Sequence, residues 1–310
     1  MSTFAAKENV GLDLTGKVAA IAGGTQGIGM ATGLRFAEAG ASVYVIGRDE
    51  ARGASVVDEL RKAGGMAEGK TFEFIKADLS LISGIKEVAA KLEAKAGTHG
   101  VDYLVCTQGK PPNGKFSINS EGHESHFAIQ VLSRFSLAYL LAKSGTLKEA
   151  VVHVCAPNGS SGKAPDTEDL ELIKAQEEGK FGFMKCGDRD GNVMDAITGE
   201  FNELYNSKGL TAYHVFPGIV ATNAVSNAGM PYPIVLLSNL FMPIISRTIG
   251  NSPKSYADIP VYLAANPKSK PLDLQFSNER LKPLPAKWLT AEPLKRKLVW
   301  EKLAEMVEKN

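Results

Sequence analysis

Residues 18–29 read Val-Ala-Ala-Ile-Ala-Gly-Gly-Thr-Gln-Gly-Ile-Gly, and this stretch decides the fold of the chain. An apolar run typical of a strand breaks into glycines at Gly23, Gly27 and Gly29, and residues 30–39 then have the pattern of a helix. Glycines adopt positive φ and let the backbone approach a ligand without an intervening Cβ. The amides and the positive dipole end of the following helix attract phosphate groups. The stretch therefore predicts a strand–loop–helix unit that binds the pyrophosphate of a dinucleotide.

The bulk composition suits one large α/β domain and gives no sign of an anionic partner. The chain has 310 residues, with 35 Lys and Arg against 34 Asp and Glu, so its net charge of +1 does not favour nucleic acid or an anionic membrane. Residues 1–17 lack the apolar segment of a signal peptide. Residues 232–245 are apolar but are interrupted by Pro233 and Pro243, and they are too short to span a bilayer. We expect a soluble chain in the cytoplasm, with an organelle left open.

The three cysteines, Cys106, Cys155 and Cys186, are odd in number and lack the spacing of metal ligands. Two of them lie in or beside apolar strand-like runs. We interpret all three as small buried residues in a reducing compartment, and we expect no metal.

Strand-like and helix-like segments alternate along the whole chain. Helices are expected at residues 30–39, 51–63, 81–96, 122–143 and 193–207. Strands are expected at residues 18–22, 42–46, 72–77, 103–106, 151–155 and 211–216, with a last one near 272–277. Several strands are continuously apolar and β-branched, which is typical of parallel strands covered on both faces. The pattern predicts an α/β fold with one doubly wound parallel sheet of Rossmann type, a single domain over residues 1–310.

Residues 278–310 form an expected C-terminal extension that ends in a helix over residues 294–307. Its apolar residues lie at helical spacing, and we favour packing on the core over binding to a partner. They are Leu294, Leu298, Val299, Leu303, Met306 and Val307.

From the glycine loop, the sheet pattern and the length, the chain resembles the short-chain dehydrogenase/reductase family over roughly residues 14–267. The resemblance implies that its phosphate loop uses Gly23, Thr25, Gln26, Gly27, Ile28 and Gly29. It also implies further nucleotide contacts from Asp78 and Leu79 after the third strand, Gly109 after the fourth, and Pro217, Gly218 and Thr222 after the sixth. Residues 224–255 correspond to the family's substrate lid, and their apolar content favours an apolar pocket or, equally, packing on the core or on another subunit.

The charge after the second strand bears on the choice of nucleotide. A site that prefers NAD places a carboxylate there to bind the ribose 2′-hydroxyl. This chain instead reads Gly47-Arg48, and a guanidinium grips a 2′-phosphate that a carboxylate would repel. The alternative is that Arg48 is a solvated loop residue and Asp49 recognises the ribose. We favour NADP, as NADPH, over NAD.

The family's catalytic serine, tyrosine, lysine and asparagine are all replaced. Ala156, Asp190, Met194 and Gln130 stand at the respective positions, so the catalytic residues are unknown. The chain has no tyrosine between Tyr139 and Tyr205, which excludes a small shift of the alignment. Tyr139 and Lys143 have the family's spacing, but they lie before the fifth strand, roughly 13 Å past Gln130 at ~1.5 Å per helical residue. We interpret that pair as an ordinary helix end.

Other polar groups offer weaker substitutes. Ser160 and Ser161 lie in a loop of turn-forming residues. Asp190 is flanked by cations that would lower its pKa, so it is a poor acid. His153 is expected to be a hydrogen-bonded core residue. His123 and His126 share one helical face but lack a third metal ligand.

The chain is most similar to an atypical fungal-type branch of the family, through Thr107-Gln108-Gly109 and Ser133-Arg134-Phe135. The resemblance implies an NADP(H)-dependent oxidoreductase acting on an apolar carbonyl or imine. A second hypothesis is a non-catalytic nucleotide-binding sensor, scaffold or assembly subunit. A third is a cyclisation or isomerisation that uses bound NADP⁺ as a fixed positive charge. Family members often form homodimers through the helices that correspond to residues 122–143 and 193–207.

Overall fold

A computed structural model describes residues 3–65, 69–109, 113–157, 162–218, 220, 251–270, 273–284 and 286–310. Its centre is a seven-stranded sheet in the order β3-β2-β1-β4-β5-β6-β7, in which every neighbouring pair is parallel. The strands are β1 Val18–Ala22, β2 Ser42–Gly47, β3 Phe72–Lys76, β4 Val101–Cys106, β5 Leu147–Val154, β6 Thr211–Val215 and β7 Phe276–Ser277. The predicted fold class is confirmed. The strand order reverses between β1 and β4, and in such sheets ligands bind outside the carboxyl ends of the strands at this reversal.

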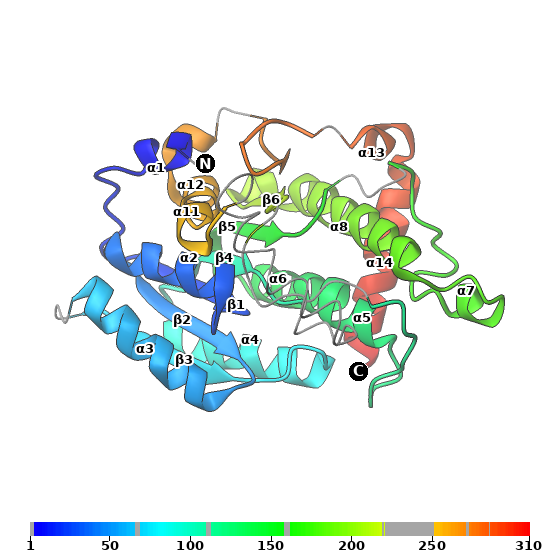
Figure 1. The fold of residues 1–310 in the computed structure, drawn as a ribbon, viewed down its shortest axis with the longest axis horizontal. Helices are drawn as coiled ribbons and strands as arrows, with labels where there is room; N and C mark the ends of the chain where they lie inside the picture. The colour runs from blue at the N-terminus through cyan, green and yellow to red at the C-terminus, as the bar shows by residue number, and fades with distance from the viewer. Residues whose placement is uncertain are drawn as a thin grey trace, which may run out of the picture.

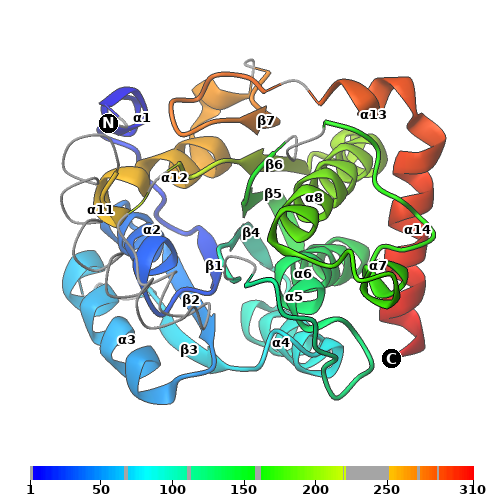
Figure 2. The same ribbon diagram turned by 45° about the vertical axis from the view of Figure 1, so that its right-hand side comes forward.

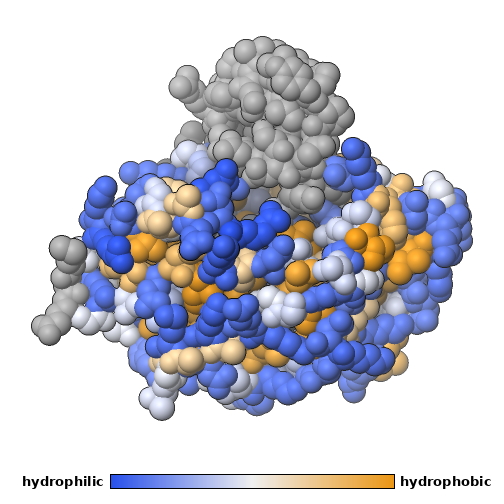
Figure 3. Space-filling view, turned by 90° about the horizontal axis from the view of Figure 1, so that it is seen from below, coloured by the Kyte–Doolittle hydropathy of each residue, from blue (hydrophilic) through white to orange (hydrophobic). Residues whose placement is uncertain are grey.

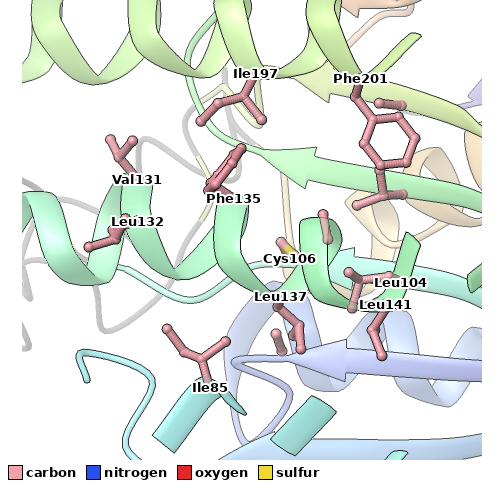
Figure 4. Close-up of a cluster of buried hydrophobic side chains, with 14 of the residues drawn as sticks. Ile85, Leu104, Cys106, Val131, Leu132, Phe135, Leu137, Leu141, Ile197 and Phe201 are labelled. Carbon is pink, nitrogen blue, oxygen red and sulfur yellow. The ribbon is translucent and has the colours of Figure 1, made fainter. Parts of the chain in front are cut away.

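Helices cover both faces of the sheet (Figures 1 and 2). On one face lie α2 Gly27–Glu38, α3 Glu50–Gly64 and α12 Asp258–Ala265, and on the other lie α4 Ile82–Ala96, α6 Ser133–Lys143 and α8 Phe183–Tyr205. The shorter elements are α1 Thr3–Glu8, α5 Ser125–Phe127, η1 Ala128–Leu132, α7 Ile173–Glu177, η2 Asn206–Lys208, α11 Pro253–Tyr256, η3 Pro267–Ser269 and α13 Lys287–Ala291. Figure 4 shows part of the core on the second face, which includes Phe135 of α6, Phe201 of α8 and Leu104 of β4.

Three helices differ from their predicted bounds by about three residues or more, and α2, expected over residues 30–39, spans Gly27–Glu38. The helix expected from residue 122 begins at Ser125, because the carboxylate of Glu124 caps it by accepting the amides of His126 and Phe127 at 2.7 and 2.8 Å. It then continues through the π-helical turn η1. The helix expected from residue 193 begins ten residues earlier, at Phe183. Its first turns contain charged residues and glycines, which hide the helical pattern in the sequence.

A C-terminal helix, α14 Pro293–Lys309, runs along the outside of α6 and α8 (Figure 2). Val299, Trp300, Leu303 and Val307 are buried in the core on this face. The ring of Trp300 meets the ring of Phe135 edge to face, with centroids 4.9 Å apart. The prediction that this helix packs on the core is confirmed, except that Leu294 at its start is exposed.

The outer surface near α3 and α4 is mostly hydrophilic, with hydrophobic residues in small patches between (Figure 3). Within the described ranges, every helix is too short or too polar to cross a membrane. Most of the predicted lid, together with Thr222, Ser160 and Ser161, lies outside the described residues. On either side of that undescribed stretch, Val220 and Asn251 form a parallel β-bridge.

Candidate functional site: a nucleotide cavity

A cavity of about 1040 Å³ opens at the carboxyl ends of the central strands. This volume is at the upper end of the range for small-molecule sites and leaves room for a dinucleotide together with a second ligand. Eleven of the thirteen predicted nucleotide contacts line it: Gly23, Thr25, Gln26, Gly27, Ile28, Gly29, Arg48, Leu79, Gly109, Pro217 and Gly218. Asp78 is not among the lining residues, and Thr222 lies outside the described part of the chain.

The glycine loop is packed tightly against the turn that follows β4. Gly23 has φ of +77°, and a Cβ there would lie 2.6 Å from the amide nitrogen of Gln108. A Cβ on Gly29 would collide with the Gly23 carbonyl oxygen and with Oγ1 of Thr107. Thr107 Oγ1 also donates to the carbonyl oxygens of Ala22 and Gly23, at 2.9 and 3.2 Å. The two glycines therefore let β1, the loop and the β4 turn meet in one rigid cradle.

The N-terminus of α2 faces this cavity. Gln26 stands at the N-cap with no side-chain hydrogen bond to the helix, so the first amides of α2 lack a capping side chain. Uncapped amides at a helix N-terminus are donors for an anion, and the helix dipole adds to the attraction. The loop and the helix therefore have the geometry that a phosphate group would need at this place.

Two arginines lie at the β2 end of the cavity. Arg48 is exposed, lines the cavity and forms no hydrogen bond or ion pair with the described residues. Asp49 is engaged elsewhere, since its carboxylate caps α3 by accepting the amide of Arg52 at 3.0 Å and lies 3.3 Å from Nε of Arg52. Arg52 also lines the cavity and donates to Oε1 of Gln26 at 3.2 Å. Arg52 was not among the predicted contacts, although its place four residues after Arg48 indicated a second cation near the same strand end.

Asp78 does not line the cavity but holds the turn whose residues do. Its Oδ1 accepts from the amide and the hydroxyl of Ser80, at 2.9 and 2.7 Å. Ala77, Leu79 and Ser80 line the cavity around it. The side chain of Asn119 joins this wall by donating to the Ser80 carbonyl at 2.7 Å. In this structure the Asp78 carboxylate holds a turn.

Three of the four positions that the resemblance assigns to the family's catalytic residues line the cavity, and the fourth does not. Gln130, Ala156 and Asp190 are lining residues, whereas Met194 is fully buried in the hydrophobic core. Gln130 donates from Nε2 to Sγ of Cys155 at 3.1 Å. A buried thioether has no charge to offer a neighbouring acid or a ribose, so position 194 has a packing role.

Asp190 belongs to a buried ionic network. Its Oδ2 lies 2.7 Å from Nε2 of His126, and its Oδ1 accepts from Nε of Arg189 at 2.7 Å. Arg189 also donates to Oε2 of Glu124 at 3.2 Å and to the carbonyl of Leu170 at 2.9 Å. Burial alone would raise the pKa of Asp190, but Arg189 and His126 together hold it below its ordinary value. The group is therefore ionised at neutral pH, as the cations beside it in the sequence suggested.

The histidines and the Tyr139–Lys143 pair were not expected to be catalytic or to bind a metal, and most of them have structural partners. His123 bonds to Glu171 at 3.2 Å and His126 to Asp190, and the described residues hold no group of three metal ligands. His153 is buried, as predicted, but neither ring nitrogen has a hydrogen-bond partner among the described residues, which corrects the expected hydrogen bond. Tyr139 and Lys143 both bind Glu308 of α14 instead of lining the cavity.

Comparisons with known proteins agree with this geometry. A model of the short chain dehydrogenase family matches residues 17–164. Retinol dehydrogenase 12 of Bos taurus is 30% identical over 241 residues, which cover 76% of this chain and 71% of that protein. The short-chain dehydrogenase/reductase SAT2 of Stachybotrys chartarum is 29% identical over 252 residues, covering 76% and 69%.

Solved structures share the fold. A short-chain dehydrogenase/reductase from Serratia marcescens superimposes with a TM-score of 0.58 at 21% identity, covering 86% of this chain and 96% of that one. A 7α-hydroxysteroid dehydrogenase complexed with NADH and 7-oxo glycochenodeoxycholic acid gives a TM-score of 0.60 at 21% identity, covering 88% and 95%. The chain belongs to the short-chain dehydrogenase/reductase family, whose members are oxidoreductases that bind a nicotinamide dinucleotide.

Proposed function

We propose that this chain is an NADP(H)-dependent oxidoreductase. The preference for NADP(H) rests on the difference between Arg48 and Asp49 at the β2 end of the cavity. Arg48 faces the cavity with no partner among the described residues, while Asp49 is held by the first turn of α3. A guanidinium binds a phosphate with charge-assisted hydrogen bonds, and Arg52 places a second positive charge nearby. Both features favour a 2′-phosphate over a bare ribose hydroxyl.

We propose positions for the rest of the nucleotide from the other lining residues. The glycine loop and the α2 amides would hold the pyrophosphate, and Leu79 would contact the adenine end, with Asp78 keeping the turn beneath it. Pro217 and Gly218, with Thr222, would hold the nicotinamide end. The volume of about 1040 Å³ and the uncapped helix N-terminus fit this group. When bound, the cofactor would supply or accept the hydride.

The substrate proposed is an apolar carbonyl or imine compound. Apolar side chains line the cavity beyond the glycine loop: Ile129, Val154, Phe183, Phe216 and Val220. Relatives at 28–30% identity are named for retinol, which supports an apolar substrate. Ala156 has no hydroxyl, and the lowered pKa of Asp190 leaves it without a proton to donate at neutral pH. An acceptor that is already activated, such as a protonated imine, needs less from this position.

A non-catalytic nucleotide-binding sensor, scaffold or assembly subunit is the second candidate. Burial of Met194 and the ionic network of Asp190 favour it, since both convert former catalytic positions into structural ones. The same two observations are compatible with a non-redox reaction beside bound NADP⁺.

Association and location follow from other features. In the described chain α14 covers α6 and α8, the helices that the resemblance assigned to pairing, so we propose that any homodimer forms through another surface. The three cysteines are free and buried, which favours a reducing compartment such as the cytoplasm.

The test is titration of the purified chain with NADPH and NADH by nicotinamide fluorescence, followed by a screen of carbonyl and imine compounds for loss of absorbance. Tighter binding of NADPH, with turnover of an apolar compound, is the expected result. Tight binding without turnover over a broad panel favours the second candidate. Absence of binding by either nucleotide overturns both.

A further inference from the structure

One cysteine in the cavity wall has surroundings unlike those of the other two. Cys155 follows β5, is 8% exposed and lines the cavity together with Ala156, its neighbour at the former serine position. Its sulfur accepts a hydrogen bond from Nε2 of Gln130 at 3.1 Å, and Gln130 lines the same cavity. An amide donor at sulfur stabilises the thiolate form. Cys106 and Cys186 are buried away from the cavity lining.

A histidine–carboxylate pair has its histidine on the strand beside this thiol: the amide of Cys155 donates to the carbonyl of Val215 at 3.1 Å, and His214 precedes Val215 on β6. His214 of β6 places Nδ1 at 2.8 Å from Oδ1 of Asp195 in α8, and both side chains are fully buried. Because Nδ1 donates to the carboxylate, the neutral ring carries its lone pair on Nε2. That atom has no hydrogen-bond partner in the described part of the chain, yet the imidazole interacts with Cys155. Nε2 of His214 is therefore placed to accept a proton, and the thiol of Cys155 is the group that would donate it.

The positive charges around the sulfur also lower the pKa of Cys155. Burial alone would raise the pKa of Cys155, but His214 and the guanidinium of Arg134 in α6 outweigh it and lower the pKa, with Asp190 opposing them. Burial would lower the pKa of His214, but Asp195 and Cys155 raise it. His153 lies in register with His214 on β5, and burial together with His214 and Arg134 keeps its pKa well below the ordinary value. It therefore stays neutral and does not compete for the proton.

The other two thiols provide internal comparisons. Burial raises the pKa of Cys106 to about 12 and that of Cys186 to about 11. Thiols in apolar surroundings are inert, whereas a thiol next to a cation is nucleophilic.

We propose that Cys155, His214 and Asp195 form a reactive thiol centre in the cavity wall, at which Cys155 adds to a conjugated carbonyl compound. His214 takes the thiol proton, and Asp195 stabilises the resulting imidazolium. The sulfur forms a bond to the β-carbon of the ligand, the π electrons of the C=C bond move to the α-carbon, and water in the open cavity protonates that carbon, while the proton taken up by His214 returns to the solvent and neutralises the hydroxide. A thiolate is a soft nucleophile suited to this electrophile, and the addition needs no oxidant, reductant or nucleotide. This centre is independent of the proposed redox function.

N-Ethylmaleimide, itself a conjugated carbonyl compound, provides the probe. The folded, nucleotide-free chain is labelled for short times between pH 5 and 10, and peptide mass spectrometry gives a separate rate for each cysteine. We expect Cys155 to react at least about tenfold faster than Cys106 and Cys186 at pH 7, with a rate midpoint below the ~8.5 of a free thiol. The midpoint reports the thiolate fraction whatever the access of the reagent. A midpoint at or above 8.5, or a rate equal to that of the other two cysteines, overturns the proposal.

Two substitutions test the role of the pair. Asp195→Asn and His214→Asn should each move the midpoint of Cys155 labelling upward by one pH unit or more, which is a loss of about tenfold or more in rate at neutral pH. Cys155→Ser should remove that label and leave the other two rates unchanged. Folding is checked by thermal unfolding, and if both variants fail to fold, the wild-type midpoint alone decides. A midpoint that stays in place in a folded variant overturns the role of His214 and Asp195.

Discussion

Nε2 of His126 lies 2.7 Å from Oδ2 of Asp190, at the position where the family resemblance places a catalytic tyrosine. The other oxygen of the same carboxylate is held by Arg189. Both oxygens are therefore occupied by cationic or neutral donors within the protein, and the carboxylate joins α5 to α8. A position that the resemblance assigns to proton transfer has become a structural tie.

Asp190→Asn should destabilise the fold. The amide keeps the shape but removes the charge, so Arg189 is left buried with only Glu124 as a charged partner, at 3.2 Å. Breaking a buried ion pair from one side costs about 3–5 kcal/mol, and we expect a loss of that order in the free energy of unfolding measured with urea. Glu203→Gln is the control, since this exposed carboxylate meets Arg296 at 3.5 Å on the surface and should change the value by less than ~0.5 kcal/mol. Equal stability of the two variants would contradict the tie.

The contribution of Asp190 should also depend on pH with a definite sign. Its pKa in the folded chain is lower than its ordinary value of 3.8, so the stabilisation is fully present above that value and is lost as the pH falls through the folded pKa. The difference in unfolding free energy between wild type and Asp190→Asn should stay level from pH 7 to 5 and shrink below about pH 4. A difference that already shrinks between pH 7 and 5 would show that another group carries the effect.

Arg48→Ala should weaken NADPH binding selectively. A lost hydrogen bond to a charged group costs about 1.5–3 kcal/mol, so the dissociation constant for NADPH should rise about 10–100-fold while that for NADH stays nearly constant. Arg61→Ala is the matched control on α3, where the guanidinium pairs with Asp58 at the surface. Fluorescence titration of both nucleotides measures the effect. An equal loss for NADPH and NADH would mean that Arg48 does not contact the 2′-phosphate.

Two glycines of α2 give a matched pair for the cradle. A Cβ at Gly29 would strike the Gly23 carbonyl and Thr107, whereas at Gly33 it would meet only side-chain carbons at 3.6 Å or more. Gly29→Ala should lower the unfolding free energy by about 1–3 kcal/mol and abolish nucleotide binding, because the loop must shift. Gly33→Ala should leave binding intact and change stability by no more than about 1 kcal/mol. Calorimetry with and without nucleotide separates the two effects, and wild-type binding by Gly29→Ala would refute the rigid cradle.

Trp300→Ala should show how much α14 contributes to the fold. The side chain of Trp300 on α14 is buried against Phe135 of α6 and Phe201 of α8. Removing its ring should therefore lower the free energy of unfolding by about 3–5 kcal/mol. Leu294→Ala, on the same helix but 82% exposed, should cost less than ~0.5 kcal/mol. Denaturant unfolding followed by far-ultraviolet circular dichroism measures both. Similar small losses would indicate that α14 is loosely held.

The sequence predicted the parts of this fold that depend on local pattern. The strand Val18–Ala22 was predicted at its observed bounds, and the other strands were predicted in place with ends that differ by one to four residues, because continuous apolar runs are recognisable in a buried parallel sheet. The start of α8 was not, because its first turns are polar and stable only through partners such as His126, 64 residues away from Asp190. The glycine loop was predicted from the spacing of its glycines. The pair of His214 and Asp195 was not predicted, because the sequence does not show which residue of a helix faces which residue of the strand beneath it.

The position of α14 determines the surface to which the outer faces of α6 and α8 must be complementary. A surface that pairs with a copy of itself about a two-fold axis must be complementary to itself, so each residue is constrained by its own symmetry mate. Phe135 and Phe201 instead meet Trp300, a residue supplied by the same chain. Under the proposal that any pairing uses another surface, the two helices escape that symmetry, and their apolar residues can vary together with α14 alone. Changes here are expected as compensating pairs within one chain.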